Sequence, residues 1–334
     1  MRKLLLLILL FLLAAVPAGC FLLSGRQEEP ANEINHFPEK DMQSEAPGVK
    51  LRETVFYLPE ASWRFLIPVR IYIPWEEGIA KATLRYCTAG NLPEPAAAAG
   101  INALLPAGTR ILGMSINDGL ARVDFSREFL AYPTEHEDLV IDGITYTLTE
   151  FPTIDRVKIL VEQTEPVFPG GASAAEPFRR EFGLNLEVDD DVGDFAGTGR
   201  ITLYFLHAAG DSIFYVPVTR VIAAPGDLLQ AVAQELLAGP KRGRGLFSAI
   251  PAGISLQTVT LEDSRVVLHL AGEPSLEGGQ EAADRLRQQV ALTFTEIDGI
   301  NEVAVLVNGK APDFGPGVHF PESFGRPKQW NLVD

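Results

Sequence analysis

The chain has 334 residues, of which 46% are hydrophobic and 22% are charged, and its formal net charge is −16. This length and hydrophobic content are sufficient for about two domains with cores of their own. The acidic balance argues against a nucleic-acid partner, because phosphate binding requires clustered lysine and arginine.

The first twenty residues have the pattern of a leader. A basic start, Met1 to Lys3, precedes an apolar run from Leu4 to Val16 that is too short to span a bilayer. The Ala-Gly-Cys ending at Cys20 resembles a bacterial lipoprotein signal, in which the cysteine is acylated. We therefore expect residues 1–20 to be a signal peptide and Cys20 to anchor an extracytoplasmic chain to the cell membrane. An uncleaved anchor or ordinary secretion is the alternative.

Residues 21–49 are predicted to form a flexible tether, because they are rich in Pro, Glu, Gln and Ser and contain few large apolar residues. If Cys20 is acylated, Cys87 has no partner, and we expect it to be a small buried side chain. No spacing of Cys or His fits a metal site, and we expect no cofactor.

The rest of the chain is a tandem duplication. Three pairs of landmarks recur about 145 residues apart: Ala89-Gly90 and Ala238-Gly239, Gly100-Ile101 and Gly245-Leu246, and Leu105–Gly108 and Ile250–Gly253. We place the first copy at 50–165 and the second at 199–314, joined by a linker at 166–198 and followed by a tail at 315–334.

The first copy is predicted to begin with strands at 54–57 and 65–73, with Pro68 indicating an edge strand or a bulge. A helix at 80–89, a hairpin across Asp118-Gly119 and a last strand at 157–161 follow. The β-branched residues at 144–149 favour a strand on their own. Their match to a helical segment near Thr295 favours a helix over 138–154, and we predict the helix.

The second copy is the clearer one. We predict strands at 200–206 and 213–222, then a helix that begins at Asp227, whose carboxylate can cap it, and ends at Gly239-Pro240. A hairpin at 256–270, a helix with an apolar stripe at 283–297 and a strand at 303–307 complete the unit. In the linker, Asp189–Asp191 do not fit a calcium-binding loop and are expected to be solvated, with a cation or partner contact as the alternative. The tail is expected to pack irregularly on the second copy or to remain loose.

Both copies therefore read β-β-α-β-β-α-β. This order predicts an α+β fold of two tandem two-layer units, each a mixed sheet with two helices on one face.

Several of these segments together resemble the GerMN domain of sporulation and spore-germination lipoproteins. The resemblance rests on Tyr204-Phe205, Val216–Arg220, Glu235–Pro240, Ile250–Gly253 and, in the first copy, Val123–Ser126. It implies a compact fold similar to the ring-building modules of secretion machines. It also implies a role in assembling the channel complex between mother cell and forespore, and it brings no catalytic residues.

An enzyme remains the alternative. Asp124 and Glu128 could act as paired carboxylates in glycosidic cleavage of peptidoglycan, although capping and turn bonding also explain them. No serine lies in a nucleophile motif, and the five histidines are scattered.

The turn after the capped helix carries Lys241, Arg242 and Arg244, the one concentrated basic patch. It is either a solvated loop or a contact for an acidic partner or an anionic wall polymer. We expect a non-enzymatic assembly protein whose partners are the membrane, through its lipid, and other envelope or sporulation channel proteins. A peptidoglycan-processing or polymer-binding lipoprotein is the second hypothesis.

Overall fold

The computed structural model describes residues 50–188, 192 and 197–333. The predicted leader with Cys20, the predicted tether and Asp189–Asp191 lie outside the described residues. What the sequence indicates for these segments therefore remains a prediction.

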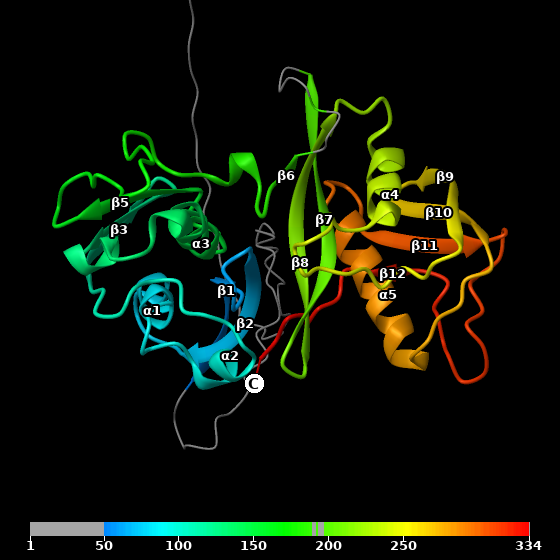
Figure 1. Cartoon of the computed structure of the whole chain (residues 1–334), viewed down its shortest axis with the longest axis horizontal. Helices are drawn as coiled ribbons and strands as arrows, with labels where there is room; N and C mark the ends of the chain where they lie inside the picture. The colour runs from blue at the N-terminus through cyan, green and yellow to red at the C-terminus, as the bar shows by residue number, and fades with distance from the viewer. Residues whose placement is uncertain (1–49, 189–191, 193–196, 334) are drawn as a thin grey trace, which may run out of the picture. The chain divides into compact units, whose positions relative to one another are not determined.

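The order of elements agrees with the sequence pattern in both copies (Figure 1). The first copy has one additional short helix, α2. Its elements are β1 (Leu51–Pro59), β2 (Leu66–Pro74), α1 (Ile79–Tyr86), α2 (Glu94–Ala98), β3 (Ile111–Asn117), β4 (Leu120–Phe125), α3 (Glu137–Thr149) and β5 (Arg156–Val161). The remaining elements are β6 (Glu187–Val188), β7 (Thr198–Ala209), β8 (Ser212–Ala223), α4 (Leu228–Ala238), β9 (Ile254–Glu262), β10 (Arg265–Gly272), α5 (Gly279–Phe294), β11 (Glu302–Val307) and β12 (Phe324–Gly325).

The α+β class and the duplication are confirmed, but each copy divides its strands between two sheets. In the first copy β1 pairs with β2, and a separate mixed sheet has the order β3-β4-β5. In the second copy the sheets are β6-β8-β7 and β12-β11-β10-β9. The single mixed sheet predicted for each copy differs from this arrangement, because a strand pattern indicates strands but not which of them pair. The long helix of each copy packs across both sheets: α3 contacts β1 and β5, and α5 contacts β7 and β11.

Helix α3 resolves the ambiguous segment of the first copy in favour of a helix. Its β-branched residues fit because the helix is buried on most sides, with Thr145 and Thr147 almost inaccessible. The Thr147 hydroxyl accepts a hydrogen bond from the Tyr57 N–H at 2.9 Å, whereas the Thr145 hydroxyl donates to the carbonyl of Ile141 in its own helix. Packing has overridden the local strand propensity of this segment.

Helix α4 begins and ends as its sequence indicates. The Asp227 carboxylate accepts a hydrogen bond from the Gln230 N–H at 3.0 Å, and Gly239 ends the helix with a φ of 81°. Val232 and Leu236 are buried on the face that packs on the core. In the first copy Cys87 occupies the place of Leu236 and is a fully buried free cysteine, as expected.

Candidate functional site

The two copies are joined by short segments that follow each of them, which we call the first extension (residues 176–188) and the second extension (residues 322–333). Both contain the pattern Phe-x-Arg-x4-Asn-Leu, with 146 positions between Arg180 and Arg326 and between Asn185 and Asn331. The phenylalanines pair with the outer edge of the last strand of their own copy, Phe178 with Val157 and Phe324 with Val303. The extensions are therefore part of the duplicated unit.

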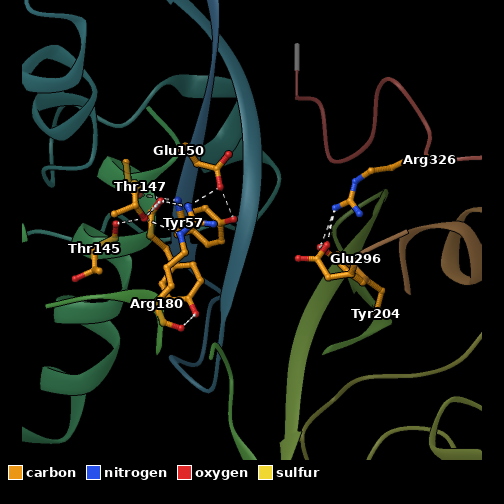
Figure 2. Close-up of polar contacts among 10 residues, drawn as sticks. Tyr57, Thr145, Thr147, Glu150, Arg180, Tyr204, Glu296 and Arg326 are labelled. Atoms are coloured by element: carbon orange, nitrogen blue, oxygen red, sulfur yellow. Dashed lines mark hydrogen bonds and ion pairs between the residues drawn. The ribbon is translucent and has the colours of Figure 1, made fainter. Parts of the chain in front are cut away.

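Each extension is fixed to its own copy by a tyrosine–glutamate–arginine cluster (Figure 2). In the first cluster, the Tyr57 hydroxyl donates to Glu150 Oε1 at 2.9 Å, and Arg180 Nη2 lies 2.7 Å from the same oxygen. Arg180 also donates to the Tyr146 carbonyl at the end of α3. The arginine thus attaches the first extension to the end of α3 and to β1.

The second cluster repeats this arrangement at equivalent residues. The Tyr204 hydroxyl donates to Glu296 Oε2 at 3.0 Å, and Arg326 Nη2 lies 2.9 Å from that oxygen. Burial, with the neighbouring glutamate adding to it, raises the pKa of both Tyr57 and Tyr204 well above the usual value for a phenol. Both phenols therefore remain neutral donors, which suits a structural role and not proton abstraction.

Two buried asparagines connect the copies to each other. Asn185 accepts a hydrogen bond from the Leu66 N–H and donates to the carbonyls of Leu66 and Pro217, each at 2.8 Å. Asn331 accepts from the Tyr215 N–H and donates to the carbonyls of Tyr215 and Pro68, each again at 2.8 Å. We call these two sets the asparagine bridges. Each bridge joins β2 of the first copy to β8 of the second.

The bridges are related by the duplication, because Leu66 and Pro68 in β2 correspond to Tyr215 and Pro217 in β8. Each proline carbonyl accepts from an asparagine, while the proline itself has no N–H that would need a partner at this edge. Within the first copy β2 pairs with β1, so Pro68 lies at the edge of its own sheet, as predicted. The other edge of β2 meets the second extension through a bridge between Arg70 and Leu332. The backbone of Asn331 adds a further contact, since its carbonyl accepts from the Arg70 N–H at 2.8 Å.

The glycine landmarks of the duplication lie at the same interface. A Cβ at Gly100 of the first copy would meet Ala209, at the tip of the second hairpin, and a Cβ at Gly245 of the second copy would meet Arg64, at the tip of the first. The residues that follow pair with the hairpin of their own copy: Ile101 bridges Glu60, and Phe247 bridges Leu206. The recurring landmarks thus mark reciprocal contacts as well as local turns.

Comparison with known proteins identifies the repeated unit. The family model described as Germane, sporulation and spore germination, matches residues 54–166 and again residues 202–313. The chain belongs to this family.

Relatives of known sequence and structure come from Bacillus subtilis. The chain is 32% identical over 279 residues to the spore germination protein GerM of Bacillus subtilis (strain 168), covering 80% of this chain and 75% of that protein. The structure of the tandem GerMN domains of the sporulation protein GerM from Bacillus subtilis matches with a TM-score of 0.68 and 28% identity, over 85% of this chain and 100% of that one. The first GerMN domain of that protein alone matches with a TM-score of 0.35 and 30% identity, over 39% of this chain and 98% of that one.

The predicted basic patch lies against the first extension of the first GerMN domain. Lys241 Nζ donates to the Val188 carbonyl, and Arg244 Nη2 donates to the Leu186 carbonyl. Arg242 is exposed. Lys241 and Arg244 therefore help to hold β6 in place. The contact with a partner or polymer remains a prediction, which is best tested at Arg242.

A buried ion pair fixes the same extension from the other side. Arg220 Nη2 lies 2.6 Å from Glu187 Oε2, and Arg220 Nη1 lies 2.8 Å from Glu235. The side chains of Arg220 and Glu187 are only 3% and 1% exposed. Removing Glu187 would leave Arg220 paired with Glu235. Removing Arg220 would leave the buried Glu187 with Arg244, 3.8 Å away, so either change is expected to be destabilising. The equivalent of Glu187 in the second extension is Val333, so this pair belongs to the first extension alone.

The two carboxylates of the enzyme alternative have separate structural surroundings. Asp124 Oδ1 accepts a hydrogen bond from the Gln163 N–H at 2.8 Å, which fixes the turn after β5. Hydrogen bonding from Ser126 lowers the pKa of Glu128. A general acid for glycosidic cleavage needs a raised pKa, so Glu128 is poorly suited to that role.

The residues at the centre of the site were not anticipated from the sequence. Asn185, Asn331, Arg180 and Arg326 fall in segments interpreted as linker and tail, where loop composition gives no indication of burial. A usable signal exists in the repeated Phe-x-Arg-x4-Asn-Leu spacing, which extends the internal repeat beyond the landmarks on which the domain limits were based.

Proposed function

We propose that this chain is a lipid-anchored, non-enzymatic component in the assembly of the channel complex between mother cell and forespore. The observation that carries the proposal is the reciprocal docking of the two GerMN domains. The two asparagine bridges fix one domain to the other, and the two tyrosine–glutamate–arginine clusters fix each extension to its own domain. Such a body can present its surfaces in a defined geometry, as an assembly component requires.

The anchoring part of the proposal rests on the sequence around Cys20. Among the residues that the structure describes, no helix has the length and hydrophobicity needed to cross a bilayer. Acylation of Cys20 would attach the domains to the membrane through residues 21–49.

Complementation tests the proposal. A Bacillus subtilis strain that lacks its GerM would receive this chain or its variants, and heat-resistant spores, germination and crosslinks to neighbouring envelope proteins would be counted. We expect function from the unchanged chain, loss on Cys20→Ala, and loss of crosslinks when Asn185→Ala and Asn331→Ala are combined. Protein levels measured by immunoblotting control for instability.

The competing hypotheses give different results in the same strain. The pair Asp124→Ala and Glu128→Ala should leave germination and crosslinks unchanged, and its loss of function in a folded protein would favour peptidoglycan processing instead. Arg242→Glu, a change at an exposed residue, should weaken recruitment only if the basic turn contacts a partner or an anionic polymer. Full function of Cys20→Ala would refute the anchored role.

A further inference from the structure

Each GerMN domain leaves one edge of its mixed sheet open. The far edges are covered by the extensions, through Phe178 on β5 and through β12 on β11. In the described ranges 50–188 and 197–333, no strand or isolated bridge pairs with the outer edge of β3 or of β9. An open edge presents unpaired N–H and C=O groups along its length, which can accept a further strand.

These edges lack the charges that normally protect an exposed strand. Strand β3 contains no Asp, Glu, Lys or Arg, and β9 contains one, Glu262 at its end, although the whole chain has a net charge of −16. Each strand has one bulged residue without a cross-strand partner, Leu112 in β3 and Gln257 in β9. The bulges leave two short regular segments, Gly113–Asn117 and Thr258–Leu261, as the equivalent pairing sites.

Each open edge strand carries a partly exposed apolar side chain. Ile116 lies opposite the buried Ala121 and is 41% exposed, and Leu261 lies opposite the buried Val266 and is 53% exposed. Cross-strand partners share a face, so the apolar layer beneath the helices continues to the open strand. An added strand must therefore carry apolar residues on that face and uncharged polar residues on the other. Strands β3 and β9 have this composition themselves.

We propose that the open edge of β3 in one copy of the chain pairs antiparallel with the open edge of β9 in a second copy. Each copy has a net charge of −16, and a contact through strand segments without charged residues places no like charges directly against each other, which favours these edges over the rest of the surface. Pairing β3 with β9 also uses both open edges of every molecule. The inference deepens the proposed function, on which its role in the cell rests, by naming a second copy of the chain as a partner.

Crosslinking of single-cysteine variants tests the pairing. A chain that begins at residue 21 retains the compact unit Asp41–Asp334 and lacks Cys20, while Cys87 is fully buried and unreactive. It would be bound through an N-terminal histidine tag to vesicles with nickel-chelating lipids, which raises the local concentration as an anchor would. A short bis-maleimide reagent would then be added to mixed Ser115→Cys and Thr260→Cys variants.

We expect the mixture to give at least five-fold more crosslinked dimer than either variant alone or than Arg122→Cys, an exposed position on β4. Ile116→Lys with Leu261→Lys should reduce the yield to that of the Arg122→Cys control, with an unchanged unfolding midpoint because both residues are exposed. Equal yields from the mixture and the controls would overturn the pairing, and so would efficient crosslinking of Ser115→Cys with itself. Because purified protein is used, failure here would leave the complementation results unaffected.

Discussion

At the scale of single residues, a buried asparagine side chain can satisfy backbone groups that a neighbouring strand usually satisfies. Asn185 and Asn331 each satisfy both backbone groups of one residue and one carbonyl of the facing strand. Leaving such groups buried without partners costs about 1 to 3 kcal/mol each. Both asparagines have positive φ angles of 53°, a conformation that asparagine tolerates better than most residues.

A glycine beside the first bridge is constrained by its surroundings. Gly183 has a φ of 87°, and an added Cβ would lie within 2.5 Å of three atoms of the Thr219 side chain. Gly171 has a φ of 94° in open space. We predict that Gly183→Ala lowers the free energy of unfolding by about 1 to 3 kcal/mol more than Gly171→Ala, the range expected for overpacking. Urea denaturation measures both, and equal losses would contradict the contact with Thr219.

Asp142 on α3 should make stability depend on pH. Burial, with Asp138 nearby, raises its pKa to about 7. The folded state thus favours the protonated carboxyl. The contribution of this protonated group to stability is complete below the unfolded pKa of about 4 and is lost as pH rises to about 7. Between pH 4 and pH 8, the free energy of unfolding of Asp142→Asn should therefore rise by about 2 to 4 kcal/mol relative to that of the native chain. Urea denaturation at a series of pH values measures this difference. A difference between the two proteins that stays constant across this range would contradict the shift.

At the scale of elements, α3 and α5 hold the hairpins in place through one hydroxyl each. Thr147 accepts from the Tyr57 N–H, and Thr293 accepts from the Tyr204 N–H at 3.1 Å. The two threonines are separated by 146 positions, as are the bridges. Helix and hairpin are therefore attached in the same way in both domains.

Substitution of Thr147 and of Thr145 distinguishes the roles of these two hydroxyls (Figure 2). Thr147→Val keeps the shape of the side chain but leaves the buried Tyr57 N–H without a partner, which should cost about 1 to 3 kcal/mol. Thr145→Val removes only a bond within the helix and should cost less than about 1 kcal/mol. Urea denaturation of the two variants measures both losses in free energy of unfolding. A larger loss at Thr145 would refute the role given to Thr147.

The same elements show how far the sequence can lead. The internal repeat identified α3 as a helix where propensity alone favoured a strand, and the cap and stop of α4 were readable from Asp227 and Gly239. The division of each copy into two sheets was not readable, because strand pattern does not say which strands pair. The asparagine bridges could not be read from the sequence either, because Asn331 contacts a carbonyl 263 residues away in the chain.

At the scale of the whole molecule, the duplication produced an interface as well as a second domain. Each extension belongs to one domain and contacts the other, so neither β2 nor β8 keeps its outer edge open. Among the described residues, the open edges are instead those of β3 and β9. The interface between the domains and the proposed contact between copies therefore use different strands.

Hydrogen exchange in Asn331→Ala most directly tests whether the two domains are docked as one body, with Gln329→Ala, an exposed change in the same extension, as the control. The Tyr215 N–H in β8 bonds to the Asn331 side chain, and the Arg70 N–H in β2 bonds to its carbonyl. We predict that Asn331→Ala accelerates exchange at both amides by about 10-fold or more, which corresponds to about 1.4 kcal/mol. Faster exchange at Tyr215 with an unchanged rate at Arg70 would contradict the reciprocal docking.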